Sequence, residues 1–369
     1  MLKKFSVSNF KNFKNKIVLD LGKTCNYEFN ENLIKNGCVS KGIIVGINGS
    51  GKSNLALALF DITIHLTDKE KMLRNYSNYL NLNSVKEMTE FKYEFVFEGV
   101  SVVYKYTKKG PTSLVSETLI ISDEEVVHYD FINNVGFTTL KGAETLKLVS
   151  SENSVSRVKY LIGTAILDEE DSKNKIFRTF ADYVNNMLMF YSLDERGYQG
   201  FILGSDSFTK GIIRANKVKQ FEAFLRSQGI DYELVVREVN GEKDLFCKFE
   251  RAEVAFGAVA STGTRSLALF YYWYIVMGRA SFVFIDEFDA FYHFELSKTI
   301  IELLKKLPNT QVFVSTHNTD LLSNDLLRPD CYFEIKDNKI RSFNEMTDKD
   351  IRKAHNIQKM YKAGAFNGE

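Results

Sequence analysis

The segment Gly46–Ser53 has the residue types and spacing that bind the phosphates of a nucleotide. It has the sequence GINGSGKS, which matches the pattern GxxxxGKS. The glycines let backbone N–H groups wrap around an anion, and a helix that begins directly after the loop adds positive potential. Lys52 is then expected to reach the β and γ phosphates, and the Ser53 hydroxyl is expected to ligate Mg²⁺. The alternative is a glycine-rich turn without a ligand.

Two neighbouring carboxylates follow the apolar segment Val283–Ile285. An apolar strand that ends in Asp286 and Glu287 puts acidic groups at the carboxyl edge of a parallel sheet, where ligands bind. We expect Asp286 to hold Mg²⁺ through water, and Glu287 to orient or deprotonate the water that attacks the γ-phosphate. Taken alone, the pair would be interpreted as a solvated strand end, but beside a phosphate-binding loop it indicates nucleotide hydrolysis.

Two further motifs could contact the same phosphate. His317 follows the next predicted strand and could donate a hydrogen bond to a γ-phosphate oxygen. The turn 261–265 (STGTR) precedes a long apolar helix and offers the Ser261 hydroxyl and helix N–H groups. The alternatives are a structural histidine and an ordinary helix cap.

The elements that must position these residues alternate between strands and helices. Residues 4–21 predict a β-hairpin, 42–45 a buried strand, and the apolar run after Lys52 a helix. Strand-then-helix units recur at 282–304 and from 311 onward, which predicts an α/β fold with a mainly parallel sheet. The period-two pattern of residues 91–150 predicts antiparallel hairpins.

These patterns divide the chain into four parts. Residues 1–90 hold the hairpin and the phosphate loop, and residues 91–150 form an antiparallel β region. Residues 151–250 are expected to form an inserted helical or mixed lobe, with FRTFADYVNNMLMF and KVKQFEAFLRSQG as helices. Residues 251–369 return to the parallel sheet.

Composition excludes several classes of protein. The 369 residues include 48 Lys and Arg against 47 Asp and Glu, so nucleic-acid contact would need a local basic patch. The four cysteines never form a CxxC pair, which argues against a zinc ribbon or a disulfide framework. Neither a secretory leader nor an apolar stretch long enough to span a bilayer is evident, and we expect a cytoplasmic protein with no membrane partner.

In this order the motifs resemble those of the ABC-type ATPases, and in particular the SMC/RecF-like branch. KKFSVSNFKNFKNKIVLDL is similar to that branch's N-terminal hairpin, GINGSGKSN to its Walker A motif, and VFIDEFDAFYH to its Walker B motif and D-loop. VSTHN is similar to its switch-histidine strand. The signature motif stands here as ASTGT in place of LSGGQ or SSGT, and it retains Ser261 and Gly263. The C-terminal tail is similar to that of standalone prokaryotic ATPases of the abortive-infection group.

The resemblance implies an ABC-type P-loop ATPase head that uses ATP and Mg²⁺. It implies Glu287, His317 and Lys52 as catalytic residues, and Ser53 and Asp286 as metal ligands. The nucleotide-binding residues that it implies are Gly46, Asn48, Gly49, Ser50, Gly51, Lys52, Ser53, Asn54, Ser261, Gly263 and Asp289. It also implies a head-to-tail homodimer or higher oligomer, in which the signature motif of one copy completes the site of the other. Asp289 would then cross the interface, the alternative being an exposed loop acid.

The sequence leads us to expect a protein that binds and hydrolyses ATP. Its ATP-dependent dimerisation would regulate a partner in antiphage defence. That partner would be an effector such as a nuclease or toxin encoded nearby, or DNA or RNA. The alternatives are an ATP-binding scaffold that sequesters a toxin or nuclease with incidental hydrolysis, and a RecF-like DNA-repair ATPase. The lysines that suggest nucleic-acid contact are Lys3, Lys4, Lys11, Lys14, Lys16, Lys105, Lys108 and Lys109.

Overall fold

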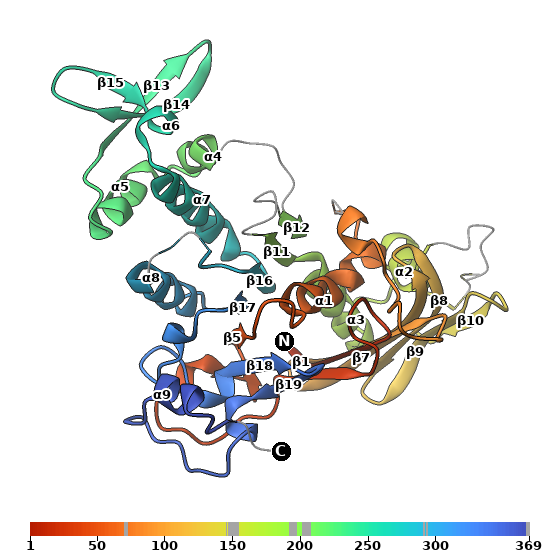
Figure 1. Cartoon of the computed structure of the whole chain (residues 1–369). Helices are drawn as coiled ribbons and strands as arrows, with labels where there is room; N and C mark the ends of the chain where they lie inside the picture. Colours follow the sequence, from red (N-terminus) through yellow and green to blue (C-terminus); the bar gives the residue numbers. More distant parts are fainter. Residues whose placement is uncertain are drawn as a thin grey trace.

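The computed structural model describes residues 1–69, 73–144, 146, 155–191, 198–200, 208–290, 292 and 294–366. These residues form two large sheets with a long helix between them, and a smaller lobe that projects to one side (Figure 1).

The central sheet carries the predicted strand-then-helix units. Its strand order is β12-β11-β16-β17-β5-β18-β19, and its five inner strands run parallel. These are β5 (Lys41–Val45), β11 (Met187–Tyr191), β16 (Phe282–Asp286), β17 (Gln311–Thr316) and β18 (Tyr332–Lys336). The edge strands β12 (Tyr198–Gly200) and β19 (Lys339–Ser342) are antiparallel. Apolar runs such as Phe282–Ile285 suit this sheet because a parallel sheet is covered on both faces.

Helix α1 (Lys52–Leu66) begins in the phosphate loop and is buried on nearly all sides. It contacts β11 and β16 of the central sheet, and Tyr93 of the second sheet donates a hydrogen bond to the carbonyl of Ala58. A helix that is apolar all round is stable in such a position because no face needs water. The two sheets therefore share one core with α1 inside it.

The second sheet is antiparallel, as the period-two pattern predicted. Its order is β10-β9-β8-β7-β6-β1-β2. Its strands are β1 (Leu2–Ser8), β2 (Ile17–Asp20), β6 (Thr89–Phe97), β7 (Val100–Gly110), β8 (Ser113–Ile121), β9 (Glu124–Asp130) and β10 (Val135–Thr138). Alternate residues face α1, α2 (Arg157–Thr164) and α3 (Ser172–Asn185), which leaves a polar outer face.

The segment 151–250 differs from the expected inserted lobe. Helix α3 ends at Asn185, and the apolar residues Met187–Phe190, predicted as helical, belong with Tyr191 to strand β11 beside β16. Five apolar residues fit a buried strand or a helix equally well by pattern, and pairing with the central sheet decides the outcome. The first part of this segment thus belongs to the same body as the sheets.

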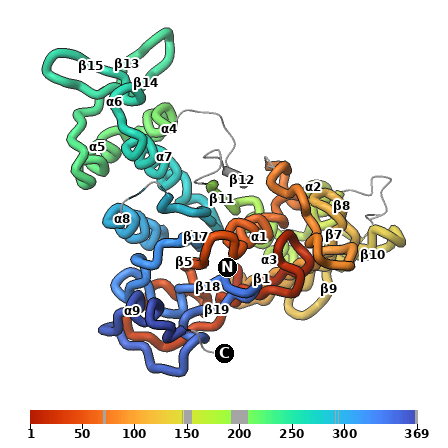
Figure 2. Tube along the Cα trace, in the orientation of Figure 1, coloured from red at the N-terminus to blue at the C-terminus, as the bar shows by residue number. Residues whose placement is uncertain are grey.

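Residues 208–260 form the projecting lobe with the N-terminal end of α7 (Thr262–Met277). The lobe contains α4 (Phe208–Arg214), α5 (Val218–Ser227), α6 (Phe256–Val259) and a three-stranded sheet of β13 (Glu233–Val239), β14 (Glu242–Lys248) and β15 (Glu253–Ala255). Figure 2 shows that α7 leads from this lobe back to β16. The predicted helix KVKQFEAFLRSQG is α5, and Gly229 follows it with a φ of 79°.

The remaining described elements complete the head. The short strands β3 (Ile34–Lys35) and β4 (Cys38–Val39) pair with each other and precede β5 in the chain. Along the chain, α8 (Phe294–Lys305) connects β16 to β17, and α9 (Ile357–Lys362) follows β19. Short 3-10 helices lie at Glu31–Leu33, Leu73–Tyr76, Thr319–Leu321, Pro329–Cys331 and Phe343–Glu345. Within the described ranges, none of the helices combines the length and apolar character that crossing a bilayer requires.

Candidate nucleotide-binding site

The loop Gly46–Gly51 joins β5 to α1 and requires glycine at two positions. A Cβ on Gly46 would lie 2.8 Å from the carbonyl oxygen of Ile335, so a side chain there would collide with backbone. Gly51 has a φ of 108°, and a Cβ on it would lie 2.6 Å from the Asn12 amide nitrogen. L side chains rarely adopt this φ, and glycine adopts it without steric cost.

The loop is open to solvent where an anion would bind. Ile47, Asn48 and Gly49 are exposed, and so is Ser53. Gly51 caps α1 without a side-chain hydrogen bond, so the first helix amides have no side-chain acceptor at the cap. Free amides and the helix dipole together make this end of α1 suited to phosphate.

Lys52 connects the loop to the acidic end of β16. Its side chain is buried, and its ammonium donates hydrogen bonds to the carbonyls of Gly46 (2.8 Å) and Ile47 (3.2 Å). Burial lowers the pKa of this ammonium below its ordinary value. Three nearby carboxylates act in the opposite direction and raise it, those of Glu287, Asp286 and Asp289. The phosphate loop and the end of β16 therefore lie close together.

Ser315, on the neighbouring strand β17, holds both residues of the acidic pair. Its hydroxyl donates to Asp286 Oδ1 at 2.5 Å and accepts the backbone N–H of Glu287 at 2.8 Å. The parallel register of β16 with β17 and of β17 with β5 brings the carboxyl ends of all three strands to one edge. This is the edge at which α/β sheets bind ligands.

Glu287 has an uncommon backbone conformation. Its φ is 44°, in the left-handed region that residues other than glycine seldom adopt. The Ser315 hydroxyl fixes its N–H, and the next N–H, that of Phe288, donates to the Ser315 carbonyl at 3.2 Å. Such strain is held only where surrounding contacts impose it, and it concentrates at functional sites.

Asp289 is buried, so the alternative of an exposed loop acid is wrong, while its crossing to a second copy stays a prediction. It is 8% exposed, and Thr316 donates a hydrogen bond to its Oδ2 at 2.9 Å. Its other oxygen, Oδ1, is buried and has no hydrogen-bond partner among the described residues. Within one chain Asp289 thus faces inward, toward the end of β17, instead of standing exposed. No local sequence pattern predicts this contact, because Thr316 is 27 residues away.

His317 lies at the same sheet edge as the phosphate loop. It directly follows Thr316, which pairs with Val45 at the end of β5, and its side chain is exposed. Thr316 also accepts the N–H of Asn318 at 2.9 Å, which fixes the chain on the far side of His317. The imidazole is therefore free to meet a group bound at the loop.

The turn at Ser261 lies away from the phosphate loop of its own chain. Ser261 caps α7 by accepting the N–H of Thr264 at 3.1 Å. Figure 1 shows this end of α7 in the projecting lobe, while its other end leads to β16, and a 16-residue helix is about 24 Å long. Ser261 and Gly263 are exposed, and a Cβ on Gly263 would meet only Ser261 Oγ, at 3.9 Å. The motifs at 46–53, 286–289 and 317 meet in one chain, and the turn at 261–263 does not join them.

Three contributors to the site were not predicted from the sequence. Ser315 and Thr316 hold the acidic residues, as described above. Asn12, in the turn between β1 and β2, accepts a hydrogen bond from the Asn54 amide at 2.7 Å and contacts the Ser50 carbonyl at 3.5 Å. Asn54 is therefore engaged with the hairpin. The sequence predicts only that Asn12 lies in the turn of the N-terminal hairpin. No motif predicts its contact with the phosphate loop.

The oxygen donors at this edge suit a magnesium ion. Mg²⁺ is usually bound through one or two carboxylates together with phosphate oxygens and water. The Ser53 hydroxyl is exposed, and Asp286 Oδ1 is engaged by Ser315. Among the described residues, no group of three or more His, Cys, Asp or Glu side chains forms a metal site of its own. A metal here would depend on the nucleotide for further ligands.

Comparison with known proteins finds one matching family model. Residues 162–323 match the family model described as "AAA domain, putative AbiEii toxin, Type IV TA system". The matched segment includes the turn at Ser261, the acidic end of β16 and His317. No curated protein matches the chain in sequence.

Solved structures of SMC head domains are distantly similar to this chain. The head bound to the C-winged helix domain of ScpA is 14% identical, with 92% of this chain and 97% of that chain covered and a TM-score of 0.46. The Thermotoga maritima head is 14% identical, with 92% and 98% covered and a TM-score of 0.43. The Pyrococcus furiosus head bound to the C-terminal domain of ScpA is 14% identical, with 92% and 96% covered and a TM-score of 0.47. Matches this distant indicate nothing about activity or partners.

Proposed function

We propose that this chain binds ATP with Mg²⁺ and hydrolyses it at the edge formed by β5, β16 and β17. The observation that supports this most strongly is the position of Lys52. Its ammonium lies in the phosphate loop and within the electrostatic reach of Glu287, Asp286 and Asp289. A loop for phosphates beside carboxylates for a metal and a water is what phosphoryl transfer to water requires.

Each residue at this edge has a distinct role in the proposal. Lys52 exchanges its loop carbonyls for phosphate oxygens, and the amides of the loop bind the same anion. Ser53 and Asp286 would hold Mg²⁺, which would supply positive charge beside the phosphates. Glu287 accepts a proton from the attacking water, and its half-buried position limits competition from bulk solvent. His317 donates to the terminal phosphate.

We further propose that a second copy of the chain completes the site. Ser261 and Gly263 stand exposed at the end of α7 opposite to β16, where they cannot serve their own phosphate loop. The space at Gly263 is open, and a groove of about 550 Å³ lies beside this turn, lined by residues of α5, α7 and α8. Donors at the N-terminus of α7 would meet the terminal phosphate held by the other copy.

The biological role that we propose is regulation of a partner effector, a nuclease or toxin, through ATP-dependent dimerisation in antiphage defence. It is supported by the description of the matched family, which names a toxin of a Type IV toxin-antitoxin system. The rival proposal is a scaffold that retains ATP and sequesters such an effector. The two differ in whether the purified chain turns ATP over.

The variant Glu287→Gln tests the proposed chemistry. General-base catalysis contributes about 10²–10⁴-fold to rate, so we expect turnover to fall by at least about 100-fold while ATP binding persists. Glu98→Gln is a matched control, because Glu98 also has a positive φ (52°) and lies in an exposed turn far from the loop. The control should hydrolyse ATP at the parental rate.

Two results would count against the proposal. Turnover of Glu287→Gln at the parental rate would remove Glu287 as the base. Tight retention of ATP by the parent chain, with negligible turnover alone and with candidate partners, would favour the scaffold.

A further inference from the structure

The outer face of the antiparallel sheet carries one continuous row of residues across all seven strands. The strand registers pair Ser6 with Val18 and Lys92, Lys92 with Lys105, Lys105 with Thr118, Thr118 with His128, and His128 with Phe137. Directly paired residues on neighbouring strands lie on the same face of a sheet. We call this set, Val18, Ser6, Lys92, Lys105, Thr118, His128 and Phe137, the cross-strand row.

Two like charges stand side by side at the centre of the row. Lys92 and Lys105 are direct partners on β6 and β7, and like charges in this position destabilise a sheet. Lys92 pairs with Glu94 at 2.5 Å, but no carboxylate lies within ion-pair distance of Lys105 in the parts of the chain that the structure describes. Another acid on this face, Glu90, lies one row away and lines the same hollow as the two lysines. An anion bound between the two lysines would relieve the repulsion.

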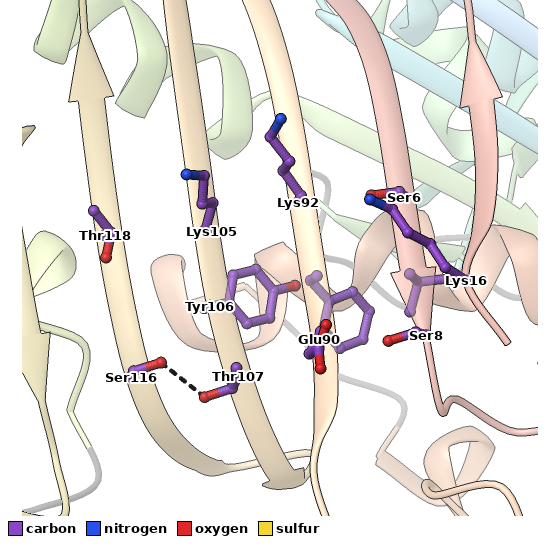
Figure 3. Close-up of a pocket in the computed structure, with 12 residues that line it drawn as sticks. Ser6, Ser8, Lys16, Glu90, Lys92, Lys105, Tyr106, Thr107, Ser116 and Thr118 are labelled. Atoms are coloured by element: carbon purple, nitrogen blue, oxygen red, sulfur yellow. Dashed lines mark hydrogen bonds between the residues drawn. The ribbon is translucent and has the colours of Figure 1, made fainter. Parts of the chain in front are cut away.

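The surroundings of the two lysines are shaped and polar. They line a hollow of about 350 Å³ together with Ser6, Thr118 and Lys16 (Figure 3). In that view Lys16, which directly precedes β2, extends toward Ser6, while Lys92 and Lys105 point out from adjacent strands. The hydroxyls are hydrogen-bond donors for anion oxygens. Phe91 and Tyr106 alternate with the two lysines along β6 and β7, so their buried rings lie on the opposite face of the sheet.

The end of the row beyond Thr118 offers a stacking surface. Thr118 is hydrogen-bonded to the His128 ring at 2.9 Å, and the His128 and Phe137 rings lie 5.9 Å apart. Phe137 is 44% exposed on the edge strand β10. An exposed aromatic ring beside a basic groove is the combination by which proteins bind unpaired bases and their phosphates.

We propose that the cross-strand row, together with Lys16 beside it, binds single-stranded nucleic acid. Lys92, Lys105 and Lys16 contact backbone phosphates, and Phe137 stacks on a base. Six strand spacings of about 4.8 Å give a row about 29 Å long, enough for several nucleotides. A single strand suits the site better than a duplex, because stacking on Phe137 needs a base that is not paired. This inference does not depend on ATP hydrolysis, since a chain that binds nucleic acid without turning ATP over would satisfy it.

The test measures binding of a fluorescein-labelled deoxythymidine oligomer of about 20 nucleotides to the full chain. Binding is monitored by fluorescence anisotropy over a range of salt concentrations. The double variant Lys92→Gln/Lys105→Gln should weaken binding at least tenfold. It should also reduce the slope of log affinity against log salt by about 1.4, since each phosphate contact on a single strand contributes about 0.7. Its thermal stability should not fall, because the substitution removes a repulsion.

The control is Lys336→Gln/Lys339→Gln, which removes two exposed lysines that are also direct cross-strand partners, but in the β18–β19 hairpin. It should weaken binding less than twofold. Phe137→Ala should weaken binding about fivefold or more and leave the salt slope unchanged. Equal losses in the two lysine pairs, preference for a duplex of the same length, or no binding of the oligomer at low salt would each overturn the proposal.

Discussion

Replacing Ser315 with alanine should separate the positioning of the acidic pair from the acidic pair itself. The Ser315 hydroxyl is fully buried and makes two hydrogen bonds, one to the Asp286 carboxylate at 2.5 Å and one from the Glu287 N–H at 2.8 Å. A hydrogen bond to a charged group contributes about 1.5–3 kcal/mol and an ordinary one about 1 kcal/mol. The free energy of unfolding should therefore fall by about 2.5–4 kcal/mol.

The effect on turnover should exceed the effect on substrate binding. Without the hydroxyl, Glu287 loses the contact that holds its φ at 44°, and Asp286 loses one of its anchors. We expect kcat for ATP hydrolysis to fall by about 10–100-fold, equivalent to about 1.4–2.8 kcal/mol, with a smaller change in KM. The Mg²⁺ concentration for half-maximal turnover should rise.

A matched control distinguishes positioning from simple loss of stability. Ser342 is also buried and donates to a carboxylate, that of Glu345, at 2.8 Å, but it lies on β19 away from the site. Ser342→Ala should lose stability without losing turnover. If Ser315→Ala hydrolysed ATP at the parental rate with the parental Mg²⁺ requirement, the reasoning about the acidic pair would be refuted.

Two other substitutions test the loop and the core. Gly51→Ala should weaken binding of a fluorescent ATP analogue more than tenfold, because the added Cβ would crowd Asn12. The control Gly37→Ala, at a φ of 68° but with no atom within 4 Å of the added Cβ, should bind the analogue normally. Equal affinities of the two variants would contradict the crowding argument. Lys108→Met should cost about 3–5 kcal/mol of unfolding free energy in a denaturant titration, because it leaves Asp61 buried without the ammonium that lies 2.6 Å from it. Asp61→Leu/Lys108→Met should cost less than the sum of the two single changes, and strict additivity would argue against a coupled pair.

The salt bridge of Lys108 also corrects an expectation from the sequence. Lys108 was grouped with Lys105 and Lys109 as a phosphate contact, but its side chain is fully buried against Asp61 of α1. An irregularity between Thr107 and Lys108 shifts the pairing of β7 with β8. The regular alternation of inward-facing and outward-facing side chains along β7 is therefore interrupted before Lys109. Charge clusters in a sequence do not show which lysines face solvent.

The parts of the fold that were predicted from the sequence depend on local patterns. The hairpin β1–β2, the strand-loop-helix of residues 41–66, and strands β16 and β17 each combine an apolar period with a clear turn signal. Strand β11 was missed because its neighbour β16 lies almost 100 residues further along the chain. The contacts of Asn12, Ser315 and Asp289 were missed for the same reason, since each depends on strands that meet only in the folded chain.

The measurement that tests the central claim most directly is ATP turnover in a mixture of two inactive variants, Lys52→Ala and Ser261→Arg. One lacks the phosphate-loop lysine, and the other blocks the exposed turn at the end of α7. If two copies share each site, random mixing makes half of the dimers mixed, each with one intact site, and turnover should recover to about a quarter of the parental value. Turnover that stays at the sum of the two separate variants would contradict a site completed by a second copy.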